Sequence, residues 1–206
     1  MKWHKLGVVW NADGCNAWAK THGMGPTPYR LNDEVVRVFI TCLDDQGRGR
    51  PGYVDVAASD PTCVLGASPS AVLDIGEPGS FDDNGLMAIS IVRSEPKTLL
   101  MYYAGFELCK HIRYRIFTGL AMSYDEGETF TRYSRAPILD RTNAELHFRG
   151  GPFVMRDQGV FKLWYVAGSE WTTLSGKTMP IYDLRYLESK DGIQWADEGR
   201  VSMAIT

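Results

Sequence analysis

Polar side chains that can bind ligands or transfer protons stand beside three glycine-marked segments of the chain. They are His22 before Gly25, Asp82 and Asp83 before Gly85, and His147 with Arg149 before Gly151. Carboxylates, imidazoles and a guanidinium together suit a polar ligand better than an apolar one. If the three segments lie side by side, we expect these groups to meet at one mouth. For each histidine a structural role is an equally good interpretation. No spacing is typical of a metal site, so we expect neither metal nor cofactor.

The elements that must position these groups recur about every 64 residues. One apolar run occurs at 36–40, 99–103 and 161–165, and its aromatic residues Phe39, Tyr102 and Trp164 are 63 and 62 residues apart. A second run ends at Ser59, Ser123 and Ser189. A third element follows at 71–74, at 137–140 and, more weakly, at 201–204. A fixed period with strand-like content indicates a repeat fold.

The runs are short, rich in β-branched and aromatic residues, and bounded by turn residues, which favours strands. The second repeat predicts strands over 86–92, 99–104, 116–123 and 129–133. The third predicts them over 153–155, 161–167, 182–189 and from 193 onward. The first strands of the three repeats, over 25–31, 85–91 and 151–155, are expected innermost and parallel. Four antiparallel strands per repeat predict an all-β protein built from β-propeller blades, in preference to a two-sheet sandwich, which needs no sequence repetition.

Two hairpins share the pattern Ser-x-Asp-(x)-Gly-x-x-aromatic. They are Ser123 to Phe130 and Ser189 to Trp195. An aspartate can accept backbone N–H bonds within such a turn, the glycine supplies the turn, and the aromatic residue can pack between blades. We therefore interpret these serines and aspartates as structural rather than catalytic.

The segments 80–85 (SFDDNG), 101–105 (MYYAG) and 162–168 (KLWYVAG), with the Ser-x-Asp-Gly-x-x-Trp hairpin, resemble the five-bladed β-propeller glycosidase superfamily. That superfamily includes arabinanases and β-xylosidases, invertases and levansucrases, and mannoside phosphorylases. The resemblance covers nearly the whole chain. It implies a funnel at the propeller axis with three carboxylates, each from the innermost strand of a different blade. One would act as base or nucleophile, one as proton donor, and the third would orient the donor.

Of the three inner-strand positions where the resemblance implies acids, only the second has them in this sequence. Asp83 and Asp82 stand there and are the candidate catalytic residues. Gly25-Pro26 stands where the family commonly has Asp-Pro, and Gly150-Gly151-Pro152 where it often has Glu-Gly-Pro. Replacement acids are Glu145, Glu170 and Glu188. Among them Glu170 is the best candidate, and a solvated loop glutamate is its alternative interpretation.

The same resemblance makes several polar residues candidate sugar ligands. They are His22, His147, Arg149 and Arg185, with Trp171 as a stacking face for a pyranose ring. A core position is the alternative for the tryptophan.

Composition places the chain among ordinary globular proteins. Its 206 residues, 44% hydrophobic and 23% charged, predict one domain over 1–206, with blades at roughly 22–80, 81–145 and 146–206. A net charge of −3 gives no basic stripe for nucleic acid or membrane surfaces. The four cysteines lack metal-like spacing, and no signal-peptide or membrane-spanning stretch is present, so we expect a cytoplasmic protein.

Three blades do not close a five-bladed ring, which at this repeat length needs about 320 residues. The chain is a fragment, assembles with copies of itself, or is a minimal remnant. A homo-oligomer that completes the ring, or a truncation, is favoured, because open propeller edges invite pairing.

Two functions follow from the sequence. The first is a glycoside hydrolase-like protein acting on an oligosaccharide or glycoconjugate by general acid–base catalysis. The alternative is a non-catalytic carbohydrate-binding or scaffold propeller that has lost the family's acids. A purely protein-interacting propeller is the third and weakest interpretation.

Overall fold

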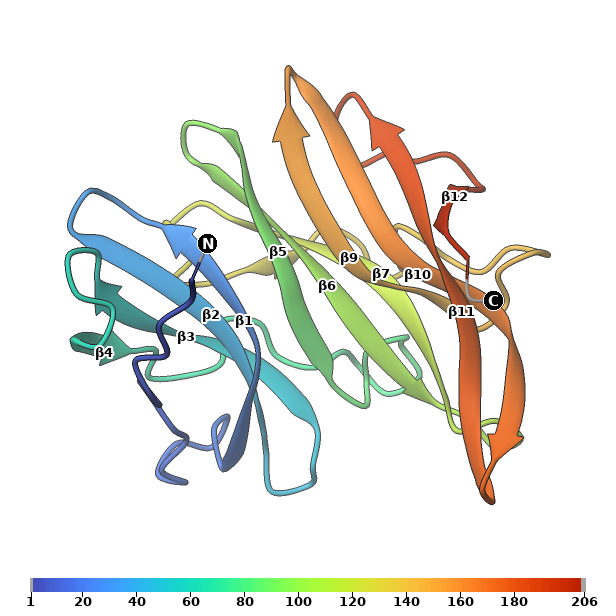
Figure 1. Ribbon diagram of the computed structural model, residues 1–206, viewed down its shortest axis with the longest axis horizontal. Coiled ribbons are helices and arrows are strands. Elements are labelled where there is room, and N and C mark those ends of the chain that lie inside the picture. Colours follow the sequence, from blue (N-terminus) through green and yellow to red (C-terminus); the bar gives the residue numbers. More distant parts are fainter. Residues whose placement is uncertain (1, 205–206) are drawn as a thin grey trace.

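The computed structural model describes residues 2–204 of the 206-residue chain (Figure 1). These residues form twelve β-strands and no helix, which confirms the all-β prediction. No segment among them is therefore a helix long and apolar enough to cross a membrane.

The strands follow one another as three four-stranded antiparallel meanders. The first meander comprises β1 (Thr21–Arg30), β2 (Val35–Leu43), β3 (Gly49–Ala57) and β4 (Val64–Ala67). The second comprises β5 (Leu86–Glu95), β6 (Thr98–Leu108), β7 (Tyr114–Ser123) and β8 (Thr131–Arg132). The third comprises β9 (Phe148–Asp157), β10 (Val160–Leu174), β11 (Lys177–Ser189) and β12 (Arg200–Met203).

Burial explains the sequence pattern of the strands. Alternate residues of β5, from Leu86 to Val92, are buried and the residues between them are partly exposed, as expected for a strand with one core face. Strand β6 is instead buried without interruption over residues 99–105. It lies in the middle of the molecule, with the first meander on one face and the third on the other.

Parallel contacts join successive meanders at matching places. Ile116 of β7 pairs with Phe148 of β9, and Gly49 at the start of β3 bridges Gly85 just before β5. Gly85 has φ +118°, and a Cβ there would lie 2.6 Å from the Gly49 nitrogen, so this close approach requires glycine. The pairings make β1, β5 and β9 parallel to one another. Within residues 2–204, β12 does not pair with β1, so the described strands form an open array.

Each of the two Ser-x-Asp turns packs against the preceding meander. Phe39 packs on Gly127 and edge-on to Phe130, with 5.8 Å between ring centroids. Tyr102 packs on Gly192, donates a 2.8 Å hydrogen bond to its carbonyl oxygen, and meets Trp195 edge-on at 6.3 Å. The aromatic residues of both turns thus pack between successive meanders.

Within these turns the serine and aspartate side chains bond to the local backbone. Asp125 accepts the Thr129 N–H at 3.0 Å, and Asp191 accepts the Ile193 N–H at 2.8 Å. Both serine hydroxyls accept the N–H of the turn glycine. The structural interpretation of these residues is confirmed.

Several predicted boundaries were wrong. Strand β1 begins four residues before the expected 25, and β9 begins at Phe148 rather than at 151–153, because strand pairing continues through the glycines. The segments 71–74 and 137–140 are not strands. They are linkers whose apolar residues Val72, Leu73 and Leu139 fill the core. The fourth strands are instead short, and β8 keeps two residues of the expected five.

Candidate functional site

The first strands of the three meanders lie side by side. Thr27 of β1 donates its hydroxyl hydrogen to the Ile89 carbonyl of β5 at 3.2 Å, and the Val154 N–H of β9 is 2.9 Å from the Ser90 hydroxyl of β5. Because β1, β5 and β9 are parallel, their starts share one end of the molecule with the β2–β3, β6–β7 and β10–β11 hairpins. This end lies toward the lower edge of Figure 1.

A polar groove of about 460 Å³ opens at this end between the first two meanders. Three elements build it: the β2–β3 hairpin, the linker before β5, and the end of β6. The side chains that supply its polar groups are Gln46 and Arg48, then Ser80, Asp83 and Asn84, and finally Glu107. The groove therefore holds two carboxyl groups that come from different elements.

Asp83 is partly exposed on the groove wall. It lies in the turn that leads into β5, where its carboxylate accepts the Gly79 N–H at 2.8 Å and its own N–H donates to the Ser80 carbonyl at 3.3 Å. Asn84, the next residue, donates its N–H to the Phe106 carbonyl of β6. These bonds fix Asp83 on the wall while leaving carboxylate lone pairs for a ligand.

Glu107 enters the groove from the end of β6, opposite Arg115 of β7 in the strand register. Its Oε2 lies 3.5 Å from Arg115 Nη1 and 3.7 Å from Arg141 Nη2, so two guanidinium groups compensate its charge. Within residues 2–204 this buried oxygen accepts no hydrogen bond. Glu107 thus lines the groove while one of its oxygens is buried near two guanidinium groups.

Asp82, the neighbour of Asp83, is fully buried. Its Oδ2 accepts hydrogen bonds from Arg132 Nε at 2.9 Å and from the Tyr103 hydroxyl at 3.1 Å, and Ser80 bonds its Oδ1 at 3.0 Å. Burial, together with the negative charge of Asp82, raises the pKa of Tyr103. In this arrangement Asp82 holds the linker against β6.

A second buried acid–tyrosine–arginine cluster precedes β9. Glu145 is fully buried, and it lies 2.5 Å from Arg149 Nε, 2.8 Å from Arg185 Nη1 and 3.1 Å from the Tyr165 hydroxyl. Arg149 also donates to the Asp140 carbonyl at 2.8 Å. The structure therefore gathers Arg149 and Arg185 around Glu145, in the same relation to β9 that Asp82 and its partners have to β5.

No protein-family model matches the chain. Two Mycobacterium tuberculosis proteins, named Uncharacterized protein Rv1502 and Uncharacterized protein MT1551, are each 29% identical to it over 201 residues. The match covers 98% of this chain and 66% of each relative, so the chain spans just under two thirds of their length.

Solved structures of glycoside hydrolases superimpose on nearly the whole chain. One named Glycoside hydrolase has a TM-score of 0.68 at 14% identity, over 98% of this chain and 62% of its own. A family 117 glycoside hydrolase from Zobellia galactanivorans scores 0.63 at 12% identity, over 94% and 50%. Sucrose-6-phosphate hydrolase from Lactobacillus gasseri scores 0.60 at 15%, over 93% and 37%. The chain has the fold of the propeller-type glycoside hydrolases. The resemblance predicted from the sequence motifs is thereby confirmed.

Glu170 and Trp171 lie at the same end, outside the groove. Glu170 is exposed on β10 and lines a second hollow of about 220 Å³ together with Arg185. Trp171 packs against Tyr114 at 5.4 Å and Phe148 at 5.3 Å between ring centroids. Trp171 is partly buried in this aromatic cluster.

The two candidate histidines differ in environment. His22 is exposed on β1, with φ +65° and its Nδ1 2.9 Å from the Thr21 hydroxyl. His147 is partly buried just before β9. Burial and the positive charges of Arg115 and Arg141 lower its pKa, so its imidazole is neutral near pH 7. Neither histidine lines the groove.

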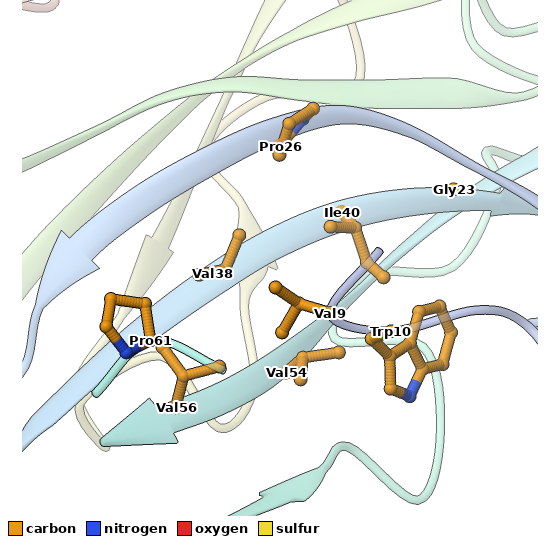
Figure 2. A pocket seen from close by; sticks show the side chains of 9 residues that line it. All are labelled: Val9, Trp10, Gly23, Pro26, Val38, Ile40, Val54, Val56 and Pro61. Atoms are coloured by element: carbon orange, nitrogen blue, oxygen red, sulfur yellow. The ribbon is translucent and has the colours of Figure 1, made fainter. Parts of the chain in front are cut away.

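An apolar pocket of about 340 Å³ lies on the outer face of the first meander (Figure 2). Val9 and Trp10 of the N-terminal segment face Ile40 and Val54 of the sheet across it. Among the described residues no titratable side chain lines it, so we assign it no part in acid–base chemistry.

Sequence reasoning missed Glu107, the second carboxyl group of the groove. Its only signal is its place at the end of the β6 run, two residues beyond the MYYAG segment. No residue pattern there distinguishes it from an ordinary solvated glutamate.

Proposed function

We propose that the chain binds an oligosaccharide in the polar groove and hydrolyses a glycosidic bond by general acid–base catalysis. One observation carries this proposal: Asp83 and Glu107, from separate elements, line one groove at the inner-strand end of a glycosidase fold. Two carboxyl groups that flank the scissile bond are what hydrolysis through an oxocarbenium-like transition state requires.

The environments of the two groups suggest different roles. Arg115 and Arg141 lie near the Glu107 carboxylate, so we assign Glu107 the role of base or nucleophile. We assign Asp83, partly exposed on the groove wall, the donation of a proton to the leaving oxygen. Asp82 is the positioning residue that holds the Asp83 turn through Arg132. Glu170 stays a candidate only for a ligand that extends into the neighbouring hollow.

Hydrolysis of a panel of nitrophenyl glycosides tests the assignment. We expect Asp83→Asn and Glu107→Gln each to lower kcat by about 100-fold or more. The matched control is Asp33→Asn, which removes a fully exposed carboxylate at the far end of β1. Unchanged kcat in both groove variants would refute the catalytic roles.

A specific observation favours a second candidate, carbohydrate binding without turnover. Strands β1 and β9 bring glycines rather than acids to the positions where the resemblance implies carboxylates, and Asp82 and Glu145 are engaged in buried ion pairs. This candidate predicts saturable glycan binding in the groove with no product formed at any enzyme concentration.

We further propose that the three meanders are propeller blades, and that a second copy of the chain, with three blades of its own, covers an open face. The third meander exposes large apolar side chains on strands β9, β11 and β12. They include Phe153, Met179, Ile181, Val201 and Met203. Such a surface invites association. A sedimentation mass of two chains supports this arrangement, and a mass of one chain at high concentration contradicts it.

A further inference from the structure

The β6–β7 hairpin is basic in a chain whose net charge is −3. Residues 107–115 carry three cationic side chains, Lys110, Arg113 and Arg115, against the single carboxylate of Glu107. Arg113 donates to the Thr178 carbonyl at 3.4 Å and so joins this hairpin to the β10–β11 hairpin, which adds Lys177. We call these residues, together with Arg141, the basic surface. The Nε of Arg141 lies 3.5 Å from Asp140 Oδ1, so Asp140 adds a second carboxylate beside it.

The inner part of this surface retains unused hydrogen-bond donors. Arg115 and Arg141 approach the same oxygen of Glu107 at 3.5 and 3.7 Å, distances longer than a hydrogen bond. The Nε of Arg115 is buried and, within residues 2–204, donates to no acceptor. A buried donor of this kind is costly unless a partner fills it.

His147 reports the electrostatic field at this place. Both Arg115 and Arg141 act on its imidazole in the same direction, and its Nδ1 is buried with no partner among the described residues. Burial is the larger cause of the lowered pKa of His147, and the positive charges of Arg115 and Arg141 add to it. Those two charges would attract an anion beside them.

Glu107 belongs to both the groove and the basic surface. A group bound by Arg115 and Arg141 would therefore sit at the edge of a sugar whose glycosidic bond lies between Asp83 and Glu107. Guanidinium forks match the geometry of carboxylate, phosphate and sulfate oxygens. We propose that the basic surface binds an anionic substituent of the glycan. This inference rests on the proposed function and names its substrate class, an acidic sugar.

Isothermal titration with inorganic phosphate and with glucuronate, at fixed ionic strength, tests the anion site on the 206-residue chain. We expect Arg115→Gln and Arg141→Gln to weaken binding of at least one probe about 10- to 100-fold. The matched control Arg30→Gln, at the opposite end of β1, should leave binding unchanged. Arg115→Lys keeps the charge without the fork, and should give intermediate binding if Arg115→Gln does not fold.

A glycan array with matched neutral, uronate, phosphorylated and sulfated members then distinguishes the source of the anion. Preference for one acidic class, lost in Arg115→Gln, supports the inference and identifies the group. Equal binding of neutral and acidic members overturns the inference and leaves the proposed function intact. Binding of no glycan overturns both. An equal loss in Arg30→Gln also overturns the inference, because the effect would then be one of overall charge.

Discussion

Glu145 is a buried acid directly before the inner strand β9, and its substitution tests whether its role is structural or catalytic. The glutamate has no exposed surface and neutralises Arg149 at 2.5 Å and Arg185 at 2.8 Å. Glu145→Gln keeps the side-chain volume and removes the charge. Arg149, only 3% exposed, is then left as a buried cation without its counter-ion.

The expected loss of stability is large. Breaking a buried ion pair from one side costs about 3–5 kcal/mol, because the remaining charge stays desolvated. For a chain of this size each kcal/mol lowers Tm by about 2–4 °C, so the variant should melt about 6–20 °C below the parent. A typical domain has a total stability of about 5–15 kcal/mol, so the change is a substantial fraction of it.

Urea and thermal unfolding followed by circular dichroism measure this change. Asp33→Asn, which breaks the exposed Arg30–Asp33 pair, is the control and should change stability by less than about 1 kcal/mol. A Glu145→Gln variant that loses less than about 1 kcal/mol of stability would refute the structural role. So would a variant that keeps its stability and loses glycan binding.

Three further changes test other parts of the fold. Gly192 has φ +74°, and a new Cβ there would lie 2.5 Å from Tyr102 Oη, so Gly192→Ala should lower the free energy of unfolding by about 2–5 kcal/mol in urea. The control Gly176→Ala, at φ +76° in open space, should lower it by about 1–2 kcal/mol. Backbone N–H bonds lower the pKa of Asp191, so its stabilising effect is present above the ordinary carboxyl pKa and is lost as pH falls through the lowered value. The free energy of unfolding of Asp191→Asn should therefore depend less on pH between pH 5 and 2 than that of the parent. A parent and a variant that lose stability in parallel over that range contradict the reasoning. Burial raises the pKa of Cys42 to about 11, so at pH 8 a thiol reagent should label exposed Cys15 first, and equal labelling rates contradict this order.

The contacts between meanders could be predicted from the sequence because they depend on residues that recur. Phe39 and Tyr102 are 63 residues apart, and each packs on the turn glycine of the following meander, Gly127 for Phe39 and Gly192 for Tyr102. Pattern and packing agree there because the same local contact is made twice. The strand boundaries were less accurate, since the pairing that extends β1 and β9 through glycine depends on neighbouring strands.

The site was predicted only in part, because burial of a charge depends on partners far away in sequence. Asp82 and Asp83 are adjacent, yet Asp82 is buried by Arg132, which lies 50 residues away, while Asp83 faces the groove. Glu107 becomes part of the same groove only when β6 is placed beside the linker before β5. None of these pairings has a local sequence signature.

A crystal structure of the chain with an oligosaccharide selected from the glycan array tests the central claim most directly. We predict that the sugar lies in the groove, with a glycosidic oxygen within hydrogen-bond distance of Asp83 and an anomeric carbon facing Glu107. A sugar bound instead in the hollow beside Glu170, or in the apolar pocket beneath Val9 and Trp10, would contradict the account.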